Sequence, residues 1–94
     1  MCGNTASGLP DSARSVTYAD QTITFINNCN FQVAIYWINY SGALHHSGQL
    51  WPGGSTGFST WVGHAWLAAD GNGDVATING MCWWTGDVTI GNIC

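Results

Sequence analysis

Lysine and glutamate are both absent from this chain of 94 residues, and Arg14 is its only strong cation. The net charge at pH 7 is -4. Neutralising nucleic-acid phosphates requires several lysines or arginines, and attraction to an anionic membrane requires a basic cluster. The composition therefore argues against a nucleic-acid partner and against binding to anionic membranes.

Targeting and membrane segments are also missing. The first residues, MCGNTASGLPDSARS, contain neither the basic n-region nor the apolar h-region of a signal peptide, so we interpret Met1 as a start codon added to a mature secreted chain. No apolar run approaches the roughly 18 residues that a membrane span requires. We expect a soluble, extracellular protein with no membrane insertion.

The four cysteines lack the spacings typical of a zinc site, since there is no C-x-x-C and no matching histidine pair. An even number of scattered cysteines in a small chain predicts two disulfides and an oxidising compartment. Three connectivities are possible, and the sequence alone does not choose among them. The terminal positions of Cys2 and Cys94 favour a clasp of the two chain ends, which leaves Cys29 to pair with Cys82.

Helix-length periodicity is absent, and β patterning takes its place. QTITFIN alternates Ile23 and Phe25 with Thr22 and Thr24, which predicts a strand with two different faces. FQVAIYWINY is apolar on both faces and is typical of a central strand. We expect further strands at residues 15–19, 57–62, 63–70, 74–79, 81–85 and 87–93, a loop at 41–56 and a tight turn at 70–73.

These elements predict an all-β fold. We expect a small β-sandwich of about seven to eight short antiparallel strands, stapled by two disulfides. Residues 1–94 then form a single domain, with residues 1–14 as an irregular N-terminal arm tethered by Cys2.

Candidate catalytic groups are sparse. The only acids are five aspartates, and no two of them stand in contexts that would push their pKa values apart. Ser59, His64 and Asp70 are the components of a triad, but no nucleophile-elbow motif surrounds the serine. We therefore expect no enzymatic activity and no cofactor.

Two motifs resemble metal sites. Asp70 begins a DGNGD run like that of an EF-hand, but Val75 replaces the glycine at the sixth position and Met81 the glutamate at the twelfth. A hairpin turn explains this run better. His45 and His46 are adjacent in an expected loop, where we interpret them as solvated side chains. We expect no metal site.

The tryptophans are the strongest functional signal, because a core this small cannot bury all six indoles. If residues 81–85 form a strand, the two adjacent tryptophans there point to opposite faces. Exposed indoles rimmed by hydroxyl and amide groups suit sugar rings or proline-like rings. The possible sugar-stacking positions are Trp51, Trp61, Trp83 and Trp84.

A family resemblance gives these residues a context. The segments ITFINNCNFQVAIYWINYSG, LWPGG, GHAWLAADG and VATING resemble the β domain of the von Hippel-Lindau tumour suppressor family. The resemblance covers residues 21–80 and runs without a gap from Trp37 to Asp70. It implies a β-sandwich that recognises a hydroxyproline-containing peptide in an aromatic pocket.

The resemblance also implies roles for residues of this chain. Trp37 and Trp66 correspond to the pocket walls, His64 to a partner of the ligand hydroxyl, and Thr60 to a serine of the family. Ser47 and Ser59 depart from the family pattern, because they stand where it has a tyrosine and a histidine, so we expect a wider pocket. The helical domain that joins the tumour suppressor to a ubiquitin ligase is absent, so ubiquitin-ligase partners are not expected.

Several functions follow as expectations. The first is a secreted, non-catalytic module that binds hydroxyproline-bearing or proline-rich extracellular polypeptide, and the second is a carbohydrate-binding module or lectin. A third is a small secreted effector, defence or taste-active protein acting on a receptor, because TFINNCNFQVAIYW resembles the opening strand of thaumatin-like proteins. His64 carries two interpretations, a ligand-facing imidazole or a core residue that ties two strands together.

Overall fold

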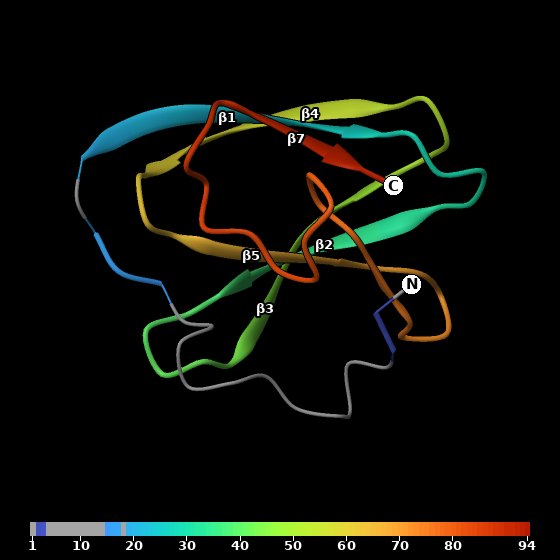
Figure 1. Cartoon of the computed structure of the whole chain (residues 1–94), viewed down its shortest axis with the longest axis horizontal. Coiled ribbons are helices and arrows are strands. Elements are labelled where there is room, and N and C mark those ends of the chain that lie inside the picture. The colour runs from blue at the N-terminus through green and yellow to red at the C-terminus, as the bar shows by residue number, and fades with distance from the viewer. Residues whose placement is uncertain (1, 4–14, 18) are drawn as a thin grey trace.

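The computed structural model describes residues 2–3, 15–17 and 19–94. In this part of the chain, seven strands form two sheets, and no helix is present (Figure 1). The expected irregular arm, residues 1–14, lies outside the described residues apart from Cys2 and Gly3. The strands are β1 (Asp20–Asn27), β2 (Val33–Ile38), β3 (Leu44–Leu50), β4 (Ser55–Trp61), β5 (Ala65–Ala69), β6 (Val75–Ala76) and β7 (Ile90–Ile93).

The upper layer in Figure 1 is a three-stranded sheet in the order β4-β1-β7. The predicted alternation in β1 is confirmed, since Ile23 and Phe25 are fully buried while Thr22 is exposed. Strand β4 pairs with β1 in antiparallel fashion, but β7 pairs with β1 in parallel. The expectation that all strands are antiparallel is therefore wrong for β7, which reaches its position by a long connection rather than by a hairpin.

The lower layer is a four-stranded antiparallel sheet in the order β3-β2-β5-β6. Strand β2 is central, as its two apolar faces predict. Its residues Val33 and Ile35 face the interior between the sheets, and Ile38 faces the other side. Trp83 packs against the outer cluster and Trp84 belongs to the inner one, so the adjacent indoles do point to opposite sides.

The largest discrepancy is β3, which lies in the segment expected to be a loop. LHHSGQL is polar and contains glycine, but it is an edge strand with mostly exposed side chains, so it needs no apolar alternation. Its register with β2 shifts between Ile35 and Tyr36. Gly48 pairs with Ile35 and His46 with Tyr36, which leaves Ser47 as the extra residue of a β-bulge.

Two other expected strands are not formed. The described residues of 15–19 belong to no strand, and residues 81–85 contribute only isolated bridges, among them one from Trp84 to Trp66. The first segment bonds to distant carbonyls, such as Ser15 to the carbonyl of Ile38, and in the second Trp84 exchanges two backbone hydrogen bonds with Trp66. The turn at 70–73 is confirmed, since the Asp70 carboxylate accepts the amide N–H groups of Asn72 and Asp74.

All four cysteines are paired, which confirms two disulfides, but the pairing differs from the expected clasp. The bonds join Cys2 to Cys82 and Cys29 to Cys94. The reason lies in the sheet topology. Because β7 runs parallel to β1, both strands end at the same edge, and the Asn28 amide bonds to the Ile93 carbonyl. That register brings Cys94 beside Cys29.

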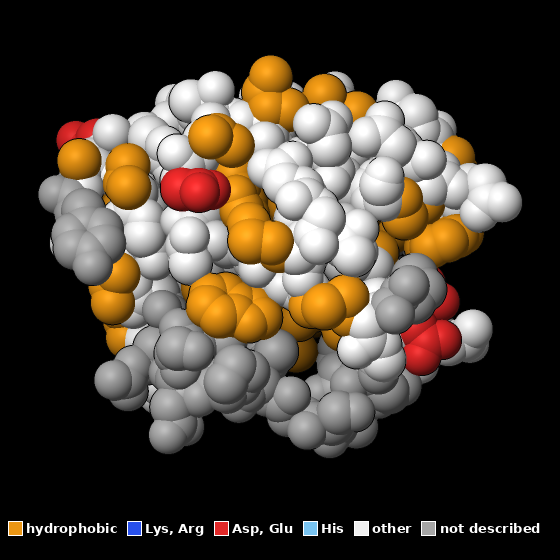
Figure 2. Space-filling view, in the orientation of Figure 1, with side chains coloured by type: hydrophobic (Ala, Val, Ile, Leu, Met, Phe, Trp, Pro, Cys, Tyr) orange, Lys and Arg blue, Asp and Glu red, His pale blue; other side chains and the backbone are white. Residues whose placement is uncertain are grey.

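The surface is poor in charge. On the face shown in Figure 2, a few acidic side chains are scattered among apolar and uncharged polar groups, and the described residues include no Lys or Arg. Among the described residues there is no helix long and apolar enough to cross a membrane.

Candidate functional site

A cavity of about 230 Å³ lies where β4 of one sheet meets β2, β3 and β5 of the other. We call it the tryptophan pocket. It brings together all the residues to which the family resemblance assigns a pocket position, and it adds Trp61. The lining residues are Trp37, Ser47, Ser59, Thr60, Trp61, His64 and Trp66.

Two indoles form the inner wall of the tryptophan pocket. Trp37 on β2 and Trp66 on β5 are direct partners in the antiparallel register, so their side chains lie side by side on the same face. Trp66 is only 4% exposed, and its ring packs against Phe25 and Phe58 at centroid distances of 5.4 and 5.3 Å. This wall is therefore fixed by the core before any ligand arrives.

His64 stands between the turn after β4 and the start of β5. Gly63 has a φ of 93°, in the left-handed region that favours glycine, and this turn sets the imidazole against the pocket. The His64 ring stacks on Trp37 with a centroid distance of 5.3 Å and an interplanar angle of 25°. It is buried, with 6% of its surface exposed.

Both ring nitrogens of His64 have protein partners. Nδ1 lies 3.1 Å from the carbonyl oxygen of Val16, and Nε2 lies 3.5 Å from the hydroxyl of Tyr40. A carbonyl only accepts, so Nδ1 carries the hydrogen, and Nε2 of the neutral ring is an acceptor. Nδ1 thus ties His64 to the segment before β1, and not to a second strand as one interpretation of the sequence expected. Nε2 makes a longer contact with Tyr40, which is 57% exposed.

Three lining residues carry buried polar atoms with no partner among the described residues. They are the hydroxyl of Thr60 and the indole nitrogens of Trp37 and Trp66. Thr60 pairs with Gln21 across β4 and β1 and is 7% exposed. An unpaired buried polar group costs about 1–3 kcal/mol, so each one needs an explanation. A ligand with hydroxyl or carbonyl groups would supply one for Thr60.

The rim of the pocket is formed by small and exposed side chains. Ser47, the extra residue of the bulge in β3, lines this rim. Ser59 and Trp61 are alternate residues of β4 that face outward, and Trp61 is 43% exposed. No lining residue is acidic, lysine or arginine, so the pocket suits an uncharged group.

The possible sugar-stacking tryptophans differ widely in exposure. Trp51, in the loop between β3 and β4, is 70% exposed, and Trp61 is also exposed. Trp83 is half-buried. Trp84 is fully buried and donates its indole N–H to the Asp87 carboxylate at 2.8 Å, so its assignment as a stacking platform is wrong. The core between the sheets accommodates this indole because β7 and the segment before it close over it.

The other candidate groups are not brought together. Asp70 lies at the far end of β5 from His64, about 20 Å along an extended strand, so the structure does not assemble a triad with Ser59. His45 and His46 are exposed neighbours on β3 whose rings contact Trp37 and Tyr36 respectively, and they diverge. No group of three or more His, Cys, Asp or Glu side chains suited to a metal occurs within the described residues.

Two contacts of the site escaped the sequence analysis. Tyr40 follows Trp37 by three residues, yet its ring packs edge-on against both Trp37 and His64. Val16 contributes only a backbone carbonyl, which leaves no signal in a side-chain pattern.

The fold and the pocket define a β-sandwich binding module. A comparison with protein-family models agrees, since the model of the VHL β domain matches residues 13–82. The chain therefore belongs to the von Hippel-Lindau β-domain family, whose domains bind proteins. A search among curated proteins found no relative of the chain. Residues 83–94, which supply Trp84 and β7, lie outside the matched segment.

Proposed function

We propose that the chain is a secreted, non-catalytic module whose tryptophan pocket holds a hydroxyproline or proline ring of an extracellular polypeptide. The family supports binding of a protein ligand. The two disulfides are consistent with an extracellular location. The observation that carries the proposal is the hydroxyl of Thr60, which is buried among indoles beside His64 and has no partner within residues 2–3, 15–17 and 19–94.

The pocket has the chemistry for one hydroxyl on a small ring. The ring packs against the indoles of Trp37 and Trp66, whose faces favour apolar C–H groups. Its hydroxyl accepts a hydrogen bond from Thr60 and donates one to Nε2 of His64, where it replaces Tyr40. An unhydroxylated ring leaves Thr60 unpaired, at a cost of about 1–3 kcal/mol. The small side chains of Ser47 and Ser59 leave room for flanking peptide.

Thr60→Val tests the proposal, because it removes the hydroxyl while keeping the shape of the side chain. We expect the parent protein to bind a hydroxyproline peptide more tightly than its proline counterpart by about 1–3 kcal/mol. The variant should lose most of this preference and keep only the part that the bond from the ligand hydroxyl to His64 contributes. Its melting temperature should not fall, since an unpaired buried hydroxyl has been removed. Titration calorimetry and thermal melts give both quantities.

Thr24→Val is the matched control, since Thr24 is half-buried in the same sheet and does not line the pocket. It should leave the discrimination between the two peptides intact. Equal affinity of the parent protein for the two peptides would rule out recognition of the hydroxyl. Discrimination that survives Thr60→Val undiminished would show that Thr60 does not contact the ligand hydroxyl.

Carbohydrate binding is the second candidate, and the exposure of Trp51 favours it. An indole that is 70% exposed on a loop is a surface on which a sugar ring can stack. A glycan array run beside the peptide array distinguishes the two candidates. Binding of a glycan that is lost in Trp51→Ala, and unaffected by Thr60→Val, would favour the lectin function over the peptide pocket.

A further inference from the structure

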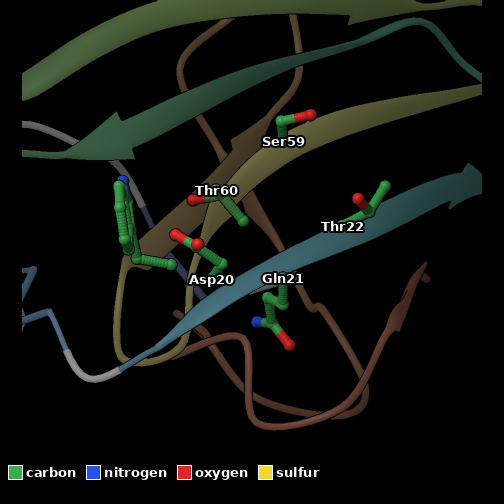
Figure 3. A pocket seen from close by; sticks show the side chains of 6 residues that line it. Asp20, Gln21, Thr22, Ser59 and Thr60 are labelled. Atoms are coloured by element: carbon green, nitrogen blue, oxygen red, sulfur yellow. The ribbon is translucent and has the colours of Figure 1, made fainter.

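A second hollow adjoins the tryptophan pocket on the outer side of strands β1 and β4. We call it the Asp20 groove, and its volume is about 300 Å³. It shares Ser59, Thr60 and Trp61 with the pocket, so one extended ligand can occupy both. Figure 3 shows the groove, whose lining residues are Asp20, Gln21, Thr22, Ser59, Thr60 and Trp61.

The strand register determines which side chains enter the groove. Asp20 is paired with Trp61 and Thr22 with Ser59, and paired residues share a face of the sheet. All four residues are exposed on the outer face. The side chain of Gln21 extends to the opposite side of β1 in Figure 3, where its amide donates to the carbonyl of Gly86.

The carboxylate of Asp20 has no hydrogen bond or ion pair with any described residue. This distinguishes it from two other aspartates of the chain. The carboxylate of Asp70 accepts two backbone N–H groups, and that of Asp87 accepts the indole N–H of Trp84. Asp70 and Asp87 thus have structural roles. Asp20 makes no such contact with the described residues, although it lies in a groove beside an indole that is 43% exposed.

The groove is rich in hydrogen-bond acceptors and carries negative charge. A carboxylate only accepts, and the hydroxyls of Thr22 and Ser59 can accept as well as donate. The face of an indole attracts cations. The chain as a whole has a net charge of -4 and no lysine, so its field also favours a basic ligand.

We propose that the Asp20 groove holds a basic side chain, lysine or arginine, of the same polypeptide whose ring occupies the tryptophan pocket. This inference rests on the proposed function, and it adds a requirement that the pocket alone does not impose. The ligand carries a positive charge within a few residues of its hydroxyproline. Asp20 pairs with that charge, and Trp61 covers the aliphatic stem.

A lysine scan tests the inference. Each alanine-based peptide contains one hydroxyproline and one lysine, and the lysine stands at one of the three positions before or the three positions after the hydroxyproline. A matched set of peptides carries uncharged norleucine in place of the lysine. At one or more positions, lysine should tighten binding by about five- to tenfold over norleucine, as expected for a partly exposed ion pair with an aromatic contact. High salt should remove most of this gain.

Two variants assign the effect to the groove. Asp20→Asn should abolish the preference for lysine while leaving the preference for hydroxyproline over proline unchanged. Asp74→Asn removes the same charge from the turn between β5 and β6, in the other sheet, and should retain both preferences. If the preference for lysine falls equally in both variants, it depends on the net charge of the protein and not on Asp20, and the proposal for the groove is wrong.

The outcomes separate this inference from the proposed function. If hydroxyproline is preferred over proline but lysine never binds better than norleucine, the proposal for the groove is wrong and the proposal for the pocket is retained. If lysine tightens binding through Asp20 while hydroxyproline and proline bind equally, the proposed recognition of the hydroxyl is wrong. The groove is then retained as a subsite for a basic side chain. A glutamate that binds better than norleucine at the sensitive position would contradict the sign of the proposed charge.

Discussion

At the scale of single residues, Thr60 and Tyr40 have opposite effects on the proposed binding of a ligand hydroxyl. Thr60 offers a buried hydroxyl with no partner in the described part of the chain, whereas Tyr40 already occupies the nitrogen of His64 that the proposed ligand would use. The contact from Tyr40 to Nε2 is long at 3.5 Å, and the same hydroxyl lies 3.2 Å from Oγ1 of Thr17. Tyr40 therefore has an alternative partner when a ligand displaces it.

Tyr40→Phe should tighten binding of a hydroxyproline peptide. The variant frees Nε2 of His64 without removing the ring that packs against Trp37, and we expect a gain of about 0.5–1 kcal/mol, the net value of one hydrogen bond. Titration calorimetry measures it. Tyr36→Phe, which removes a hydroxyl from a half-buried tyrosine that does not line the pocket, should change nothing. Weaker binding by Tyr40→Phe would show that the hydroxyl contacts the ligand itself.

At the scale of elements, the connections between strands hold the pocket in place as much as the strands do. Asn27, the last residue of β1, is fully buried and joins three segments. Its amide nitrogen lies 3.0 Å from the carbonyl oxygens of Phe31 and Leu50, and its side-chain oxygen accepts the Cys29 amide N–H at 2.9 Å. These bonds fix the loop into β2 and the end of β3.

Asn27→Ala should destabilise the protein by about 2–4 kcal/mol, because it leaves two carbonyls and one N–H without their partner in a buried site. Thermal or denaturant unfolding measures the change. Asn28→Ala is the neighbouring control, since that exposed side chain makes one bond, to Asn92 at 3.3 Å. It should cost less than about 0.5 kcal/mol. Equal losses in the two variants would contradict the role of Asn27.

The two disulfides organise the molecule as a whole. Each closes a long segment of chain, with separations of 80 and 65 residues. One attaches the N-terminal residues to the segment after β6, and the other joins the ends of the parallel strands β1 and β7. The parallel strand and its cysteine lie outside the segment matched by the family model.

A non-reducing peptide map should recover Cys2 with Cys82 and Cys29 with Cys94. Pepsin is the suitable protease, because the chain has only one basic residue for trypsin and because low pH suppresses thiol exchange. Replacing Cys29 and Cys94 together by alanine should cost about 2–5 kcal/mol of stability. Recovery of Cys2 linked to Cys94 would show that the chain ends are clasped after all, and would contradict the parallel placement of β7.

The sequence by itself determined the features that depend on local patterns. Alternation in QTITFIN predicted the two faces of β1, and the unbroken apolarity of FQVAIYWINY predicted a central strand. Cysteine count predicted two disulfides. The family resemblance placed Trp37, Thr60, His64 and Trp66 in one pocket, and the fold does bring them together. β3 was missed because an exposed edge strand lacks the apolar period on which such predictions rely.

Only the tertiary structure decided what depends on pairing between distant segments. The parallel register of β7 with β1 selected the disulfide partners and buried Trp84. The sequence around Trp84 does not distinguish it from its neighbour Trp83, which is half-buried. The register of β1 with β4 placed Asp20 beside Trp61, and the pairing of β3 with β2 brought Ser47 to the pocket. A one-residue change of register reverses the face of every side chain in a strand. Periodicity shows that a strand has two faces, but the partner strand determines what each face meets.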